Sequence, residues 1–127
     1  MTSDSEFCLN QAIDFKPLKV GVNESVAYVV KLLSQTKASC VLVIEKQKLV
    51  GIYTERDVVS MTAIRKKNAG LGIADVMSKN IISVTASQIT DIFTVLNLMR
   101  KHRIRHLPIL NELHQPIGIV TPKTIRK

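Results

Sequence analysis

The chain has 127 residues, of which 46% are hydrophobic, so it can form one domain or two small lobes with a shared core, and it is too apolar to be disordered. Eighteen basic residues against ten acidic ones give a net charge of +8, which favours anionic partners such as nucleotides, nucleic acid, anionic lipid or an acidic protein surface. No apolar run approaches the ~20 residues of a membrane span, the polar start does not fit a signal peptide, and two cysteines make no disulfide framework, so we expect a cytoplasmic protein.

The first half predicts two helices and three strands. Residues 20–22 form a short strand candidate, and Asn23 is the expected N-cap of a helix. The apolar spacing of that helix fits one buried face, made of Val26, Val29, Val30 and Leu33. Two β-rich runs follow at 41–44 and 49–53, joined by a polar hairpin connection, and a second helix should begin after Thr54.

The second half repeats this order after a polar, glycine-bearing connection at 65–72. Residues 81–84 form a strand, Thr85 and Gln88 match a capping box, and an apolar stripe from Ile89 to Met99 predicts a helix. Paired strands at 106–110 and 116–120 lead to a last helix with Pro122 at its first position. That helix is only a few residues long, and we expect it to be truncated, with the chain continuing in a longer protein; the alternative is a natural end with a frayed last helix.

Both halves therefore have the order β-α-β-β-α, which predicts an α/β fold. Neither half has much core of its own, so we expect the two to pack against each other around a pseudo-two-fold axis.

Two similar segments, Gly51–Asp57 and Gly118–Thr124, mark the strand-to-helix junction of each half. A helix N-terminus attracts phosphate, and Thr54 places a hydroxyl there that can bond a phosphate oxygen. Asp57 follows nearly one turn later on the same face and can accept hydrogen bonds from ribose hydroxyls. The same pair also resembles a capping box, which needs no ligand, and the two roles are compatible. Gly51 is suited to a close approach of another backbone segment.

The two repeats, each with the pattern Gly-apolar-x-Thr at its strand-to-helix junction, resemble a tandem pair of CBS domains (the cystathionine β-synthase type, a Bateman module). Supporting segments are 39–44 and 51–59 in the first repeat and 75–77 and 103–109 in the second. The resemblance covers nearly the whole chain from Lys16. It implies an N-terminal segment at 1–15, a first repeat at 16–68, a connection at 69–78 and a second repeat at 79–127.

The resemblance implies binding of an adenosyl ligand (AMP, ADP, ATP or S-adenosylmethionine) in a cleft between the repeats. Around Thr54 and Asp57, both repeats would contribute further residues to this first site: Cys40, Ile82, Ser83, Ile104 and Arg105. The guanidinium of Arg105 suits a phosphate because its fork donates two parallel hydrogen bonds, although a solvated surface charge is an equal alternative.

The second junction departs from the family pattern. Thr121 keeps the hydroxyl, but Thr124 stands where the ribose-binding aspartate should be. The pocket could still be lined by Val20, Gly21, Ser39 and His106. We expect this second site to be weaker, differently selective or empty. A protonated His106 could contact phosphate, and a structural role at the start of a strand is the alternative.

Three other kinds of function fit less well. Nucleic-acid binding has two basic clusters, 65–67 and 100–103, but aromatic residues are only 4% and none interleaves with them, so a solvated face or one that meets an acidic partner domain is preferred. A metal site is not expected, because His102 and His106 span a helix-to-strand boundary without a carboxylate cluster. No nucleophile–base set points to an enzyme, since Cys40 lies in an apolar run where a buried structural thiol is the default.

The sequence thus predicts a non-catalytic module that needs no cofactor and senses an adenine nucleotide as a regulatory ligand. The resemblance implies a homodimer and a covalently linked or partner signalling or effector domain. The alternative is a structural dimerisation scaffold with vestigial pockets.

Overall fold

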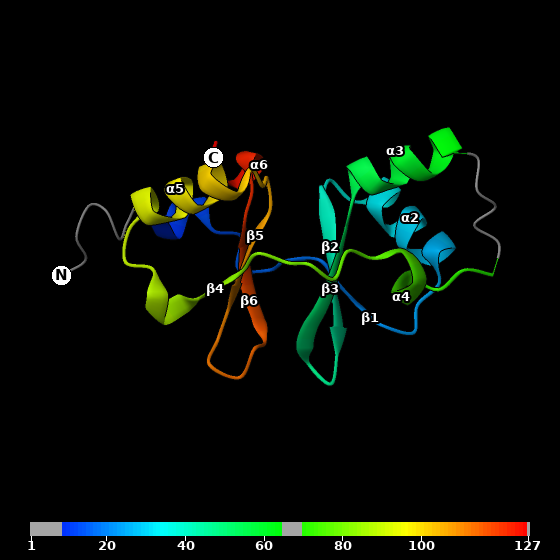
Figure 1. Ribbon diagram of the computed structural model, residues 1–127, viewed down its shortest axis with the longest axis horizontal. Coiled ribbons are helices and arrows are strands. Elements are labelled where there is room, and N and C mark those ends of the chain that lie inside the picture. Colours follow the sequence, from blue (N-terminus) through cyan, green and yellow to red (C-terminus); the bar gives the residue numbers. More distant parts are fainter. Residues whose placement is uncertain (1–8, 65–69, 127) are drawn as a thin grey trace. The chain divides into compact units, whose positions relative to one another are not determined.

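The computed structural model describes residues 9–64 and 70–126 (Figure 1). The chain forms two compact units, and each contains a three-stranded sheet. The first-repeat unit is Leu18–Ile81, and the second-repeat unit combines Met1–Pro17 with Ile82–Lys127. The predicted α/β class and the β-α-β-β-α order of both halves are confirmed.

The first-repeat unit has the strand order β1-β2-β3. Strand β1 runs parallel to β2 because helix α2 connects them, whereas β2 and β3 form an antiparallel hairpin. Lys46 and Gln47 turn that hairpin with φ of 51° and 69°, the left-handed region that tight hairpin turns require. The elements are β1 (Lys19–Gly21), α2 (Val26–Gln35), β2 (Cys40–Glu45), β3 (Lys48–Thr54), α3 (Glu55–Ile64) and α4 (Ile73–Val76).

The core of this unit lies between its sheet and its helices. Helices α2 and α3 lie on one side of the sheet (Figure 1). The buried faces that meet there come from β1, α2, β2, β3 and α4, and their residues are Val20, Val29, Leu33, Val41, Val43, Tyr53 and Ile73. Helix α3 adds the partly buried Val58. The helical face predicted from the apolar spacing of α2 is the face that packs.

The predicted N-cap of α2 was wrong by two residues. Asn23 lies in a turn that Glu24 closes by donating its N–H to the Gly21 carbonyl at 3.2 Å. Ser25 is the N-cap, and its hydroxyl accepts the N–H of Tyr28 at 3.1 Å. Because of this turn, α2 begins next to the segment that leads into α4, and Val26 donates its N–H to the Leu71 carbonyl there.

The second-repeat unit has the equivalent strand order, β4-β5-β6. Its elements are β4 (Val84–Thr85), the 3₁₀ turn η1 (Ala86–Gln88), α5 (Ile92–His102), β5 (Leu107–Leu110), β6 (Pro116–Val120) and α6 (Pro122–Ile125). A short helical segment at 9–12 packs on the same core through the buried Leu9, and Ile13, directly after it, is also part of this core. Helix α5 contributes Val95 and Met99.

Two expectations for this unit are corrected. Residues 81–83 are not a strand, since only Val84 and Thr85 pair with β5. The capping box is present, with the Thr85 N–H donating to Gln88 Oε1 at 2.8 Å, but it opens η1 and not the long helix. Helix α5 starts later, where Asp91 accepts the N–H of Thr94 at 2.8 Å, so Ile89 lies outside it.

A segment from outside the β-α-β-β-α order pairs with the last strand of each repeat. Asp14 exchanges two backbone hydrogen bonds with Ile119 of β6, both 2.9 Å long. Ser78 pairs in the same way with Ile52 of β3. We name these segments, 13–15 and 77–79, the edge straps.

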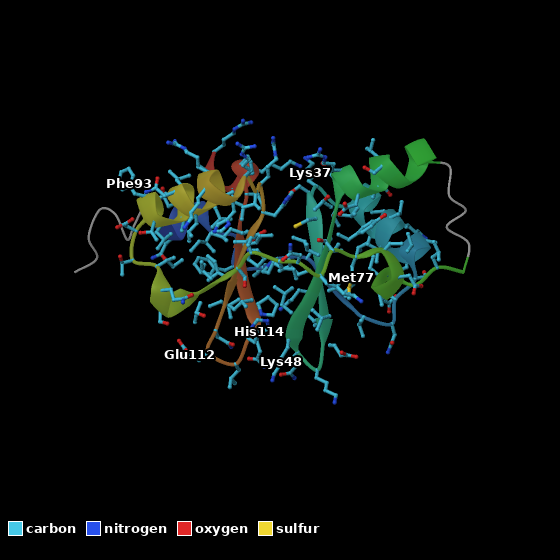
Figure 2. The ribbon with its side chains drawn as sticks, viewed as in Figure 1. Lys37, Lys48, Met77, Phe93, Glu112 and His114 are labelled. Carbon is cyan, nitrogen blue, oxygen red and sulfur yellow. The ribbon has the colours of Figure 1, made fainter. Side chains whose placement is uncertain are left out.

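In each strand, the residue before the one that pairs with the edge strap is a glycine, and the strap comes close to it. A Cβ at Gly51 would overlap the side chain of Met77, which is labelled in Figure 2. A Cβ at Gly118 would lie 2.7 Å from Ile13 Cγ2 and 3.3 Å from the Asp14 carbonyl oxygen. A close approach is therefore present at Gly51, but it is made by a side chain and not by the backbone segment predicted there; at Gly118 both a side chain and a backbone carbonyl come close.

Some expectations fall outside the described residues. These include most of the connection at 65–72, the basic cluster 65–67 and the first eight residues. Across the described ranges, no helix is both long enough and apolar enough to cross a bilayer.

Candidate ligand-binding site

The first candidate site lies where β3 passes directly into α3; we call residues 54–57 the Thr54–Asp57 junction. Asp57 Oδ2 accepts the Thr54 N–H at 2.8 Å and the Thr54 hydroxyl at 3.0 Å. The Asp57 N–H donates back to Thr54 Oγ1 at 3.2 Å. The capping-box arrangement weighed from the sequence is therefore present, and both side chains are half-buried.

This junction keeps acceptor capacity for a ligand. Among the described residues, two hydrogen bonds to Asp57 are found and both end on Oδ2, whereas a carboxylate has two oxygens with about four lone-pair sites. Glu55 and Asp57 both lie in the first turn of α3, where the helix dipole favours negative charge. The local chemistry suits a ligand that donates hydrogen bonds, such as a sugar diol.

Cys40 lies beside the junction, opposite Thr54 in the β2–β3 register. Burial, and then the negative charge of Glu55, raise the pKa of the Cys40 thiol from 9.0 to about 12. The thiol is therefore neutral at physiological pH, as expected of a buried structural cysteine. Ser39, just before it, fixes the start of α3 because its carbonyl accepts the Glu55 N–H at 3.0 Å.

The corresponding Thr121–Thr124 junction lies between β6 and α6. Thr124 Oγ1 accepts the Thr121 N–H at 2.8 Å and donates its own proton to the Thr121 carbonyl at 2.9 Å. Thr121 and Thr124 are only 4% and 8% exposed. The hydroxyl of Thr124 has thus used its single donor and is buried, where the first junction presents a charged carboxylate.

The structure brings together only some of the residues predicted for the first site. Thr54, Asp57 and Cys40 share the first-repeat unit, whereas the other four belong to the second-repeat unit. Ile82 and Ile104 pack on the core of the second-repeat unit, Ser83 precedes β4, and Arg105 is exposed between α5 and β5. The joining of both groups into one site stays a prediction.

The second predicted site divides in the same way. Thr121, Thr124 and His106 lie in the second-repeat unit, with His106 just before β5. Val20 and Gly21 of β1 and Ser39 lie in the first-repeat unit. Their grouping around one ligand also stays a prediction.

One residue at the first junction was missed from the sequence. Tyr53 is the residue before the N-cap Thr54, and Val58 is the fourth residue of α3. Both belong to the same packed cluster, an arrangement known as a hydrophobic staple. An apolar residue on each side of Thr54-x-x-Asp57 was the available signal.

The basic cluster 100–103 lies at the C-terminal end of α5. Arg100, Lys101 and His102 form the last turn of α5, where the helix dipole favours positive charge, and Arg103 ends the helix at φ 54°. In the described ranges, no three side chains among His, Cys, Asp and Glu are grouped so that they could hold a metal ion.

Comparison with known proteins identifies the family. The sequence pattern of the CBS domain matches the chain twice, at residues 12–63 and 73–127. The chain belongs to the CBS domain family. Its two matches make it a tandem CBS pair, which confirms the resemblance found in the sequence.

Relatives of this CBS pair are found within longer proteins. An uncharacterized protein of Methanopyrus kandleri is 34% identical over 124 residues, which cover 97% of this chain and 60% of that protein. Inosine-5′-monophosphate dehydrogenase of Bacillus subtilis is 37% identical over 83 residues, 65% of this chain and only 16% of the enzyme. This chain therefore spans less than two thirds of either relative.

A solved structure confirms the fold. A CBS domain pair in complex with 5′-methylthioadenosine and S-adenosyl-L-methionine aligns with a TM-score of 0.77 and 25% identity. The alignment covers 91% of this chain and 89% of the other.

Proposed function

We propose that this CBS pair is a non-catalytic regulatory module that binds an adenosyl nucleotide at the Thr54–Asp57 junction. The observation that carries the proposal is the half-buried Asp57 carboxylate beside the Thr54 hydroxyl, at the start of a ten-residue helix. A phosphate oxygen could accept a hydrogen bond from the Thr54 hydroxyl, and a ribose hydroxyl could donate one to the Asp57 carboxylate. A structural neighbour that binds two adenosyl compounds supports this ligand class.

We propose one principal site per chain. The second junction offers a neutral hydroxyl that already donates and accepts within its own turn, and it is nearly inaccessible. A ligand would have to break these bonds without gaining a charged acceptor in return. Regulation would then depend on the ligand binding the Thr54–Asp57 junction more tightly in one conformation of the module than in another.

We also propose that the regulated activity lies elsewhere, in an attached or partner signalling or effector domain. The match to a small fraction of a dehydrogenase supports a module that works beside other domains. A cytoplasmic location and a homodimer belong to the same proposal.

The decisive experiment is calorimetry with AMP, ADP, ATP and S-adenosylmethionine on wild type and Asp57→Asn. We expect at least one of the four to bind wild type, and the substitution to weaken it about tenfold or more, because a hydrogen bond to a charged group is lost. Asp75→Asn is the matched control. Asp75 caps α4 in the same unit by accepting the Gly72 N–H at 2.9 Å, so it loses a similar cap bond without touching the junction.

Failure of all four to bind to folded wild-type protein would favour the dimerisation scaffold. Equal weakening by Asp57→Asn and Asp75→Asn would contradict a site at Thr54–Asp57 and assign the loss to the helix caps.

A further inference from the structure

Tyr53 carries a buried hydroxyl that has no partner. Its side chain is 1% exposed and lies in the core cluster with Val41 and Val43. Among the described residues, its hydroxyl oxygen is a buried side-chain atom without a hydrogen bond. A buried, unsatisfied hydroxyl is costly, and phenylalanine would fill the same space without that cost. The hydroxyl is therefore explained best by a state of the protein in which it finds a partner.

The phenol lies close to the candidate site. Tyr53 directly precedes Thr54 and belongs to the core cluster against which Val58 packs, and Val58 is the residue after Asp57 in the first turn of α3. Burial raises the pKa of Tyr53, and the negative charge of Asp57 raises it further.

Ligand binding would change the donors around Asp57. In the present state, one of the two donors to Oδ2 is the Thr54 hydroxyl. A ribose can donate to the other carboxylate oxygen, Oδ1, but a phosphate that binds the Thr54 hydroxyl leaves Oδ2 with the Thr54 N–H alone, which is unfavourable unless another donor replaces the hydroxyl.

We propose that Tyr53 is a positioning residue for Asp57, whose hydroxyl donates to the carboxylate once an adenosyl ligand has released Thr54 from the cap. This inference rests on the function proposed above. The phenol would orient the carboxylate toward the ribose, and its unsatisfied state without ligand would favour the bound state.

The test compares Tyr53→Phe with Tyr28→Phe, a matched control on α2 of the same unit whose side chain is 47% exposed. For Tyr53→Phe we expect a melting temperature raised by about 3 °C without ligand, since an unsatisfied hydroxyl is removed. We expect calorimetry with AMP and S-adenosylmethionine to give a roughly ten- to hundredfold loss of affinity. Tyr28→Phe should change neither quantity.

The outcomes separate the two proposals. If wild type binds none of AMP, ADP, ATP and S-adenosylmethionine, the proposed function fails and this inference fails with it. If wild type binds and Tyr53→Phe binds equally well, only the role of Tyr53 is overturned. A lower melting temperature for Tyr53→Phe would also overturn it, because the hydroxyl would then have a partner without ligand.

A spectroscopic measurement reports the hydroxyl directly. The chain has two tyrosines and no tryptophan, so Tyr53 is the single tyrosine in the Tyr28→Phe variant. We expect S-adenosylmethionine or AMP to shift the tyrosine Raman doublet of that variant from an unbonded hydroxyl to a hydrogen-bond donor. An unchanged doublet at saturating ligand would overturn the proposal.

Discussion

At the scale of single residues, burial determines the chemistry of Cys40 and Tyr53. Both are almost inaccessible, and in both the pKa is raised, by burial first and then by a neighbouring carboxylate: Glu55 for the thiol and Asp57 for the phenol. Burial is therefore the main reason that both groups keep their protons, and the two carboxylates in the first turn of α3 add to its effect.

Cys40 gives a prediction for stability at alkaline pH. The unfolded chain loses the thiol proton near 9.0, whereas the folded chain keeps it until about 12. The folded state thus binds more protons in this window, and the free energy of unfolding falls as pH rises, by at most about 1.4 kcal/mol per pH unit from this group. Urea unfolding at several pH values should show a steeper fall for Cys8→Ser than for Cys8→Ser/Cys40→Ala.

The serine background leaves Cys40 as the single thiol, and Tyr53 contributes with the same sign in both proteins. Alanine will lower stability at every pH by leaving a cavity, so the slope is the informative quantity. Equal slopes would contradict the raised pKa.

At the scale of elements, the N-cap of α2 is a position where the prediction from the sequence differs from the structure. Ser25, and not Asn23, caps α2, so Ser25→Ala should lower the free energy of unfolding by about 1 kcal/mol. Asn23→Ala, at an exposed turn position, should stay within about 0.5 kcal/mol. Urea unfolding of the two variants measures this directly, and an equal or larger loss for Asn23→Ala would place the cap where the sequence predicted it.

The elements themselves could be predicted because periodicity reports burial. The spacing of Val26, Val29 and Leu33 and the β-rich runs around residues 41–53 placed α2, β2 and β3 within a few residues. Cap positions could not be fixed, because Asn23 and Ser25 are both good cap formers and the contact with α4 decides between them. The Thr85 box was read correctly but assigned to the wrong helix, since a local motif does not specify how far its helix extends.

In the candidate site, too, local features could be predicted from the sequence and features that depend on packing could not. Thr54 and Asp57 were found because their bonds are local, three residues apart. The hydroxyl of Tyr53 was not, because its lack of a partner depends on the packing of a whole unit.

At the scale of the whole molecule, each repeat pairs with an edge strap, a segment of the chain that lies outside its β-α-β-β-α order. The strap at Asp14 precedes the first repeat but pairs with β6 of the second-repeat unit. The strap at Ser78 follows the first repeat and pairs with its β3. Each strap should therefore stabilise one unit selectively.

Asp14→Pro and Ser78→Pro test this selectivity. Proline removes the N–H that Asp14 donates to Ile119 or that Ser78 donates to Ile52, with an expected loss of about 1–3 kcal/mol in the affected unit. In hydrogen exchange, Asp14→Pro should speed exchange in β5 and β6 while β2 and β3 stay protected. Ser78→Pro should give the opposite pattern.

Asp14→Ala separates the backbone from the side chain. It keeps the N–H to Ile119 and loses only the bond that Asp14 Oδ1 accepts from the Lys16 N–H at 2.8 Å, so exchange in β5 and β6 should stay close to wild type. If both proline variants instead open all four strands equally, the two units unfold as one. The straps would then stabilise the molecule as a whole, and a ligand bound at the Thr54–Asp57 junction would protect β5 and β6 as strongly as β2 and β3.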